Sequence, residues 1–368
     1  MSAAVVLAVS GGAQAAGTPG WRFAPIFPQS SEVMSVAAAS AANAWAVGQE
    51  YSPCDMCLFT AHWNGKKWQT IATPAGLLHQ ANRITGNAAV AATAGGRAWV
   101  FAWGAEDESG ISELSAVEWT GKSWSPVHNF PGSPSLTAAT ASGPDDVWGF
   151  GTTGTRGQTP WAVHYNGKGW SQAAISVSPS QASGSAAAGD WVTGAVAAQP
   201  GRVAVVHWDR GTWRDVALPK ISVPTGSQMF PGFIAAITPA SVWVTVGVGP
   251  STGGAAASTV LLHWNGRAWS KVPLPKQVNV YGLAGDGHGG FWVASYKVNQ
   301  PGVYLAGLVM YHYSSGHWTR VTVPVNAGFV TNLSGGNMQL IPGTQSVLAD
   351  ASLFGSQTIE GAILKYGP

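Results

Sequence analysis

The fold is decided by the stretch Ala61-His62-Trp63-Asn64-Gly65-Lys66-Lys67-Trp68, because close copies of it recur along the whole chain. The copies share an aromatic residue, a short polar turn that contains glycine and, in six cases, a second tryptophan. The first aromatic residue of the copies is Trp63, Trp119, Tyr165, Trp208, Trp264, Tyr313 and Tyr366. The seven copies therefore lie about 50 residues apart, which indicates one structural unit repeated seven times.

A second element precedes each copy by about 20 residues. It is centred on Trp45, Trp99, Trp148, Trp191, Trp243 and Trp292, and on Leu348 in the seventh unit. A run of small apolar residues, such as 35–40, 88–94 or 136–141, comes before it. Each unit therefore predicts four short strands, and an Asn-Gly-type hairpin joins the third strand to the fourth.

A four-stranded antiparallel unit repeated every 40–50 residues is typical of a β-propeller blade. The seventh unit lacks a fourth strand, but Trp21-Arg22-Phe23-Ala24 matches Trp68-Gln69-Thr70-Ile71. We therefore expect an all-β, seven-bladed propeller over residues 17–368, in which the N-terminal segment supplies the outer strand of the last blade. Seventeen of the 19 tryptophans occupy repeat positions, which predicts that they pack the blades together.

The repeat resembles that of a known group of propellers. The motif Asp146-Val147-Trp148-Gly149-Phe150-Gly151, paired with copies of the His-Trp-Asn-Gly-x-x-Trp stretch, is similar to that of secreted actinomycete tryptophan-rich β-propeller repeat proteins. This resemblance covers the whole mature chain and implies fold and export, without a single shared activity. A looser similarity to propeller lectins exists at the level of architecture.

Composition excludes several classes of protein. Charged residues make up 9% of the 368 residues and hydrophobic residues 46%, which is the opposite of a disordered chain. The net charge is +2, and the longest basic run is Lys66-Lys67, so a nucleic acid is not an expected partner. No stretch of 18 apolar residues occurs, so no transmembrane segment is expected.

The N-terminus has features of a signal peptide. Residues 3–9 form a short apolar run, and Ala13-Gln14-Ala15 is a small-residue cleavage motif. No basic residue precedes Arg22, so we expect the natural start to lie further upstream. The alternative is an apolar N-terminal strand. We predict that residues 1–16 are a truncated signal peptide and that the protein is secreted.

The cysteines and histidines predict structural roles. Cys54 and Cys57 are the only cysteines, and in an exported protein we expect them to form a local disulfide. A zinc site would need further ligands that the sequence does not supply, and a redox motif would need a βαβ unit. Five histidines occupy one repeat position, one per blade, which is too far apart for a shared metal: His62, His164, His207, His263 and His312. No metal or cofactor is expected.

Acidic residues leave an enzymatic alternative open. A glycoside hydrolase needs two carboxyl groups about 5–9.5 Å apart. Glu106, Asp107 and Glu108 form a run in the loop between the second and third strands of the second unit. Asp190 and Asp350 replace apolar residues of the second-strand pattern, and a buried carboxyl group at either position would need a partner. The sequence assigns no catalytic residue.

The variable loops predict the binding surface. The connections from the second strand to the third, and from one unit to the next, share one face of the ring and differ between units. Aromatic and acidic residues expected at this face are Trp103, Trp161, Tyr51, Tyr296, Tyr304, Glu106, Asp107 and Glu108. Aromatic rings beside polar groups suit sugars or proteins. We predict a non-catalytic propeller that binds a carbohydrate or cell-surface glycoconjugate. The alternatives are a glycoside hydrolase or polysaccharide lyase, and a scaffold for a protein partner.

Overall fold

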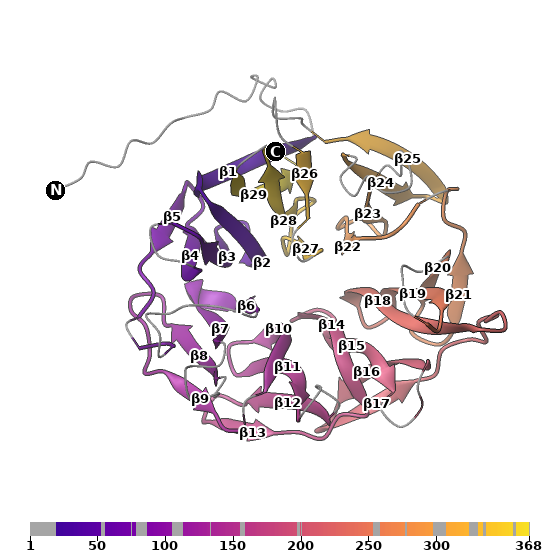
Figure 1. Ribbon diagram of the computed structural model, residues 1–368, viewed down its shortest axis with the longest axis horizontal. Helices are drawn as coiled ribbons and strands as arrows, with labels where there is room; N and C mark the ends of the chain where they lie inside the picture. The colour runs from indigo at the N-terminus through magenta and orange to yellow at the C-terminus, as the bar shows by residue number, and fades with distance from the viewer. Residues whose placement is uncertain are drawn as a thin grey trace.

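The computed structural model is a ring of small β-sheets around a central axis (Figure 1). It describes residues 20–52, 56–74, 76–78, 87–104, 113–132, 134–154, 159–196, 199, 201–252, 258–276, 278–296, 307–323, 330–333, 336–355 and 358–367. In these segments almost all regular structure is strand, apart from a short 3-10 helix, η1 (Ala94–Gly96). No helix in the described part of the chain has the length and apolar character needed to cross a membrane.

Six blades are antiparallel sheets of four strands, which follow one another in chain order from the inside of the ring outward (Figure 1). Blades 1 to 3 comprise β2 (Ser31–Ser40), β3 (Asn43–Glu50), β4 (Cys57–Trp63) and β5 (Trp68–Ile71); β6 (Ala88–Ala92), β7 (Ala98–Gly104), β8 (Glu113–Trp119) and β9 (His128–Phe130); and β10 (Ser135–Gly143), β11 (Asp146–Thr153), β12 (Thr159–Tyr165) and β13 (Trp170–Gln172). Blades 4 to 6 comprise β14 (Val177–Ser185), β15 (Gly189–Val196), β16 (Val203–Asp209) and β17 (Thr212–Val216); β18 (Ser227–Thr238), β19 (Ser241–Pro250), β20 (Ser258–Trp264) and β21 (Trp269–Val272); and β22 (Gly282–Gly285), β23 (Phe291–Tyr296), β24 (Leu308–Ser314) and β25 (His317–Thr322).

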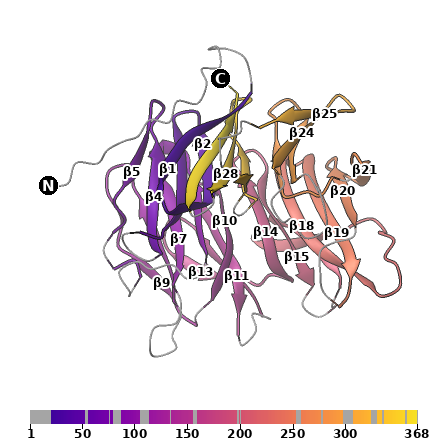
Figure 2. The same cartoon turned by 45° about the horizontal axis from the view of Figure 1, so that its top comes forward.

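The seventh blade is built from both ends of the described chain. It contains β26 (Val330–Asn332), β27 (Met338–Leu340), β28 (Val347–Phe354), β29 (Ile359–Tyr366) and β1 (Trp21–Gln29). Strand β1 pairs with β29, with Trp21 opposite Tyr366, and it runs along the C-terminal strands in Figure 2. The predicted seven-bladed propeller, closed by an N-terminal outer strand, is therefore confirmed. The inner strand differs from the prediction, because it is divided into β26 and β27, which both pair with β28.

The apolar cores lie between neighbouring blades. Trp148 and Phe150 of β11 pack with Val192 and Val206 of the next blade, and all four side chains are completely buried. The tryptophan of each second strand thus reaches the aromatic residues on the third and fourth strands of the following blade, as Trp148 does with Trp208 at 4.6 Å between ring centroids. One blade alone could not bury these rings, so the repeats stabilise one another in series.

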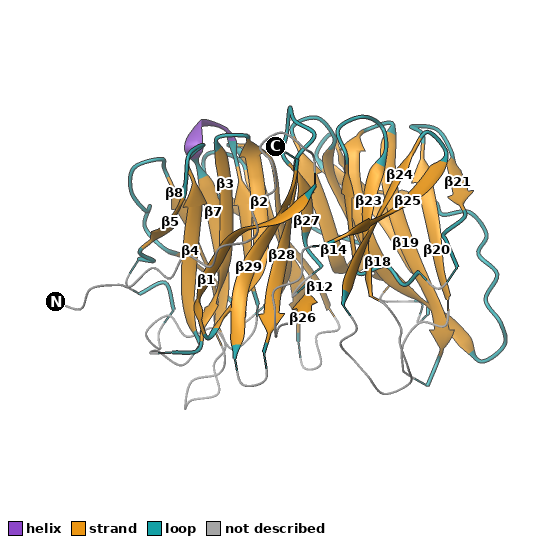
Figure 3. Ribbon diagram, turned by 90° about the horizontal axis from the view of Figure 1, so that it is seen from above, coloured by secondary structure: helices purple, strands orange, loops and turns teal. Residues whose placement is uncertain are grey.

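The short turns of the blades gather along one face of the ring, the upper edge of Figure 3, and η1 lies among them. Two-residue hairpins occur at Arg210-Gly211, since Asp209 pairs with Thr212, and at Ser315-Gly316, since Ser314 pairs with His317. The turn after Trp63 is longer, because Trp63 pairs with Trp68 and the Asn64 side chain accepts hydrogen bonds from the Lys66 and Lys67 amides at 3.0 and 3.1 Å. The asparagine therefore shapes this turn through its side chain rather than through a positive φ.

Candidate functional site

The repeated histidines are packing residues. In five blades the imidazole of the third strand stacks on the indole of the second strand, with ring centroids 4.0–4.4 Å apart. Each pair lies directly opposite in the ladder, as Trp148 and His164 do. Burial lowers the pKa of His62, His207 and His263, which favours the neutral ring. In the described part of the chain no cluster of three His, Cys, Asp or Glu side chains could hold a metal ion.

Polar groups of the short turns fix these stacked rings. Asp146 Oδ1 accepts a hydrogen bond from the Trp148 indole at 3.1 Å and lies 2.7 Å from His164 Nε2. In blade 1 the amide oxygen of Asn43 takes the same place between Trp45 and His62. The motif that dominates the sequence is therefore used for packing.

The seventh blade breaks this pattern. Leu348 occupies the tryptophan position of β28, and the residue opposite it in β29 is Lys365 instead of histidine. A pocket with a volume of about 540 Å³ lies at this seam between blades 7 and 1. It is lined by Arg22, Ala24, Ala41, Ala44, Trp63, Trp68, Ile341, Thr344, Gln345, Ser346, Leu348 and Lys365. We call it the seam pocket; it opens on the face of the short turns.

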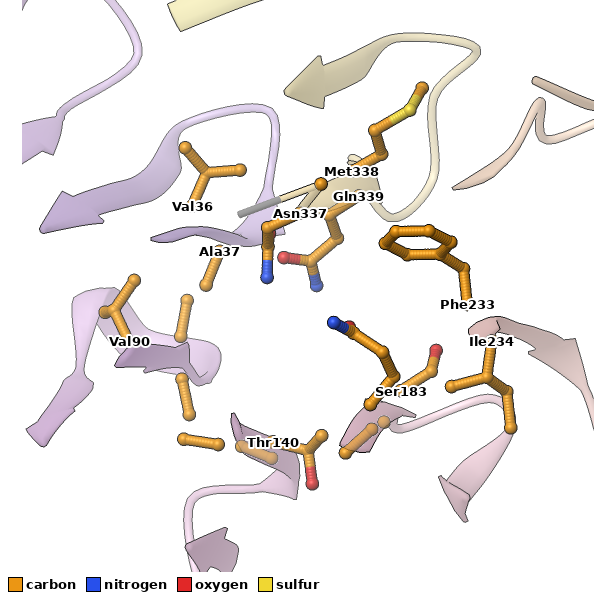
Figure 4. A pocket seen from close by; sticks show the side chains of 18 of the residues that line it. Val36, Ala37, Val90, Thr140, Ser183, Phe233, Ile234, Asn337, Met338 and Gln339 are labelled. Atoms are coloured by element: carbon orange, nitrogen blue, oxygen red, sulfur yellow. The ribbon is translucent and has the colours of Figure 1, made fainter. Parts of the chain in front are cut away.

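A narrow cavity of about 70 Å³ occupies the centre of the ring (Figure 4). Inner strands of several blades line it, and the side chains of Asn337 and Gln339 point into it (Figure 4). Gln339 also joins the seventh blade to the first, because its amide accepts a hydrogen bond from Ala38 N at 2.9 Å and donates one to Ala38 O at 3.4 Å. The Gln339 side chain thereby bridges the inner strands of two blades.

Gln339→Leu is expected to lower the free energy of unfolding by about 1–3 kcal/mol, because both bonds to Ala38 are lost and a backbone N–H is left without its acceptor. Urea denaturation of the full chain measures this change. Gln181→Leu is the matched control, since Gln181 lines the same cavity and pairs with Thr193 through its backbone, so the substitution leaves that pairing in place. Equal losses in the two variants would contradict the bridging role of Gln339.

The two tryptophans outside the repeat pattern lie mainly in an apolar core. Trp161 is 4% exposed and packs edge-on against Phe130 at 5.4 Å, between blades 2 and 3. Trp103 is half-buried against the same core, and its indole nitrogen is buried. A ring that is almost completely buried offers little surface to a ligand, so Trp161 does not belong to the proposed site.

Tyr51, which follows β3 of blade 1, is held in a polar network. Its hydroxyl donates to Glu32 Oε2 at 2.8 Å and accepts from the Gln49 amide. Burial and the neighbouring Glu32 raise the pKa of Tyr51 to about 12, so the phenol stays protonated and able to donate.

Tyr296 lies in blade 6 with an aromatic neighbour that the sequence analysis did not single out. Its ring meets Tyr281 in an edge-to-face contact with centroids 4.5 Å apart, and its hydroxyl accepts a hydrogen bond from Leu333 N at 2.7 Å. Burial raises the pKa of Tyr296. Tyr281 is 42% exposed and stands immediately before β22, at the variable-loop face. Its position in a connection without repeat motifs gave no signal in the sequence.

Several predicted site residues lie outside the described residues: Tyr304, Glu106, Asp107, Glu108 and Cys54. Cys57 begins β4, but its predicted partner Cys54 is not described, so the disulfide stays a prediction. The described structure therefore brings together Tyr296 and Tyr281, and it places Tyr51 and Trp103 in other blades.

Asp190 and Asp350 are both buried, at 1% and 0% exposure. Asp350 Oδ1 accepts a hydrogen bond from Asn337 N at 3.0 Å, which anchors the chain beside the central cavity. Asp190 Oδ1 accepts from the Thr140 hydroxyl of the preceding blade at 2.7 Å, whereas Oδ2 is buried without a hydrogen-bond partner among the described residues. Gly184 provides the space for this contact, because a Cβ there would lie 2.2 Å from Asp190 Oδ1.

No protein-family model matches the chain, and no curated protein does. Solved structures do match it. One is described as YCF48 bound to D1 peptide, with a TM-score of 0.55, 14% identity and coverage of 96% of this chain and 97% of the other. The WD40 β-propeller domain of Doa1 has a TM-score of 0.50 and 10% identity, and the match covers 94% of this chain and 97% of that domain.

Propeller lectins are also among the matching structures. The SapL1 lectin in complex with alpha methyl fucoside has a TM-score of 0.45 and 14% identity, and covers 82% of this chain and 98% of the lectin. At such identities the comparisons show that the chain shares the β-propeller fold with these structures.

Proposed function

We propose that the protein is a non-catalytic binding propeller that recognises a carbohydrate or cell-surface glycoconjugate at the variable-loop face. The observation that carries the proposal is the exposed ring of Tyr281, which Tyr296 holds edge-on. The second ring is itself fixed by the bond from Leu333 N to its hydroxyl. A pre-oriented aromatic face binds with a small loss of conformational entropy, and its hydroxyl offers a polar contact beside the apolar one.

Polar groups lie close to the backbone of Tyr281. The chain at Gly336 passes against Tyr281, because a Cβ at Gly336 would lie 2.4 Å from the Tyr281 carbonyl oxygen. The next residue is Asn337, whose backbone N–H is held by Asp350 and whose side chain points into the central cavity (Figure 4). An aromatic ring and a side-chain amide on neighbouring segments are a combination that can orient small polar ligands. We therefore centre the proposed sugar site on Tyr281 and Asn337.

Glycan-array binding of the purified full chain tests this function. Tyr281→Ala is expected to weaken binding about tenfold, because the stacking surface is removed. Tyr281→Phe keeps the ring and is expected to retain most of the binding. A blank array, or equal binding by wild type and Tyr281→Ala, would overturn the proposed site.

The second candidate is a scaffold for a protein partner. Among the described residues the exposed large apolar side chains are Val223 and Tyr281. They belong to the connections before blade 5 and blade 6, and scattered apolar residues of this kind are normal on a protein surface. This distribution favours a small-ligand site over a broad apolar interface.

A hydrolase or lyase would need two carboxyl groups that meet in one site. Among the described residues that line the central cavity none carries a carboxyl group. The geometry described here therefore supports binding better than glycoside cleavage.

We also propose that the protein is exported. The proposal is supported by the apolar run at residues 3–9 and the Ala13-Gln14-Ala15 motif, which lie outside the described residues. N-terminal sequencing of the protein recovered from culture medium tests it, and recovery of the uncleaved chain in the cell fraction would contradict it.

A further inference from the structure

The seam pocket arises where the repeat is broken twice in one blade. Six blades carry tryptophan on the second strand, and blade 7 carries Leu348. Five blades carry histidine opposite that tryptophan, and blade 7 carries Lys365. In blade 2 the histidine is also replaced, but Trp99 is kept and Glu118 is paired with Arg97. Loss of both the indole and the imidazole is thus a property of blade 7.

The other interfaces show what the missing indole would do. Trp99 packs against Tyr165 and Trp170 of the next blade, with ring centroids 4.8 and 5.0 Å apart. Trp292 packs against Tyr366 and Trp21 in the same way, at 4.4 and 5.3 Å. At the seam, the corresponding third-strand and fourth-strand rings are Trp63 and Trp68, and both line the pocket. Each has Leu348 in place of a facing indole.

These two rings are held in position without a ligand. The Trp63 indole nitrogen donates to Ala41 O at 2.9 Å, and its ring lies 6.1 Å from that of Trp68. The volume of about 540 Å³ is enough for a bicyclic or similarly small molecule. The seam pocket is therefore a preformed cavity lined by aromatic rings, and it is larger than the void that one missing methyl group would leave.

The charge at the seam is positive. Arg22 and Lys365 lie opposite each other in the β1–β29 ladder, and both line the pocket. Arg22 donates to the Gly367 carbonyl, which leaves the charge of the guanidinium in place. Burial and the charge of Arg22 lower the pKa of Lys365. No described residue that lines the pocket has a carboxyl group.

We propose that the seam pocket binds a small aromatic carboxylate. Its ring takes the place of the missing indole against Trp63 and Trp68, and its carboxylate pairs with Lys365 and Arg22. The edge-to-face contacts seen at the other interfaces would then be restored by the ligand. This site lies on the face of the short turns, so it is separate from the sugar site proposed at Tyr281 and does not depend on it.

Isothermal titration of the full chain with indole-3-acetate and with indole-3-acetamide tests the proposal, because the two probes share a ring and differ in charge. The acetate is expected to bind at least about tenfold more tightly than the amide, through charge-assisted hydrogen bonds. Lys365→Gln is expected to reduce this preference, because Arg22 alone then pairs with the carboxylate, while the amide binds as before. Equal affinity of the two probes for the wild type, or no binding of either, would overturn the proposal.

A matched double variant fills the seam pocket with the tryptophan and histidine that other blades carry at these two positions. Leu348→Trp combined with Lys365→His restores the stacked pair, so it is expected to abolish binding of indole-3-acetate while the melting temperature stays the same or rises. Tyr281→Ala is the control on the opposite face and is expected to bind the probe like the wild type. Unchanged binding by the refilled variant would show that the probe binds elsewhere and would refute the seam site.

Discussion

Trp148→Ala is expected to lower the free energy of unfolding by about 3–5 kcal/mol, among the largest losses for a single substitution in this chain. The indole is fully buried, stacks on His164 at 4.2 Å and meets Trp208 and Trp213 of the next blade at 4.6 and 5.0 Å. Its removal leaves a cavity between two blades and takes a hydrogen bond from Asp146. Urea denaturation followed by tryptophan fluorescence and circular dichroism measures the change.

Trp63→Ala is the control substitution with which the loss of stability in Trp148→Ala is compared. Trp63 also occupies a repeat position, but it is half-buried and lines the seam pocket, where part of its surface already lacks a packing partner. Its loss is therefore expected to cost about half as much as that of Trp148 or less. Equal costs at the two positions would show that the seam is packed as tightly as the other interfaces.

Asp190→Asn is expected to stabilise the protein at pH 8 by about 2–4 kcal/mol. Burial, and secondly the negative charge of Asp146, raise the pKa of Asp190 from 3.8 to about 7. The folded protein therefore binds one more proton than the unfolded chain between about pH 4 and pH 7, and stability falls as the pH rises through this range. The full shift corresponds to about 4 kcal/mol. Asparagine is uncharged at every pH and keeps an oxygen for the Thr140 hydroxyl.

The pH dependence distinguishes the cost of the buried Asp190 charge from an effect of the substitution that does not depend on pH. At pH 4 the carboxyl group of Asp190 is protonated in the folded state, so wild type and Asp190→Asn are expected to have similar stability. Asp215→Asn serves as the control, because Asp215 is an exposed carboxylate in β17 and its loss should change stability little at either pH. A stability difference for Asp190→Asn that stays constant from pH 4 to pH 8 would contradict the charge argument.

The sequence allowed the architecture to be predicted because each repeat carries its own strand and turn signals. The pairing of Trp21 with Tyr366 followed from matching the N-terminal segment with the outer strands of other units. The division of the inner strand of blade 7 could not be foreseen in the same way. It accompanies contacts of Leu333, Gly336 and Asn337 with Tyr296, Tyr281 and Asp350, which are remote in sequence.

The candidate site was harder to predict from the sequence than the architecture. Trp161 stood out because it leaves the repeat pattern, yet Phe130 of the neighbouring blade covers its ring. Trp63 and Trp68 were treated as packing residues, although Leu348 and Lys365 in the seventh unit carried the signal for a pocket. Leu348 or Lys365 alone does not indicate a pocket. Together they do, once the two positions are known to lie opposite each other in one ladder.

The closure of the ring also sets an order of events during synthesis. Arg22 and Gly367, which meet in the last blade, are separated by 345 positions. At about 5–20 residues per second, the ribosome needs roughly 20–70 s to deliver the second after the first. Strand β1, with Trp21 at its start, is thus made first and placed last. Throughout that interval it is an apolar strand without a partner, so the nascent chain must keep it from pairing with the edge of another blade.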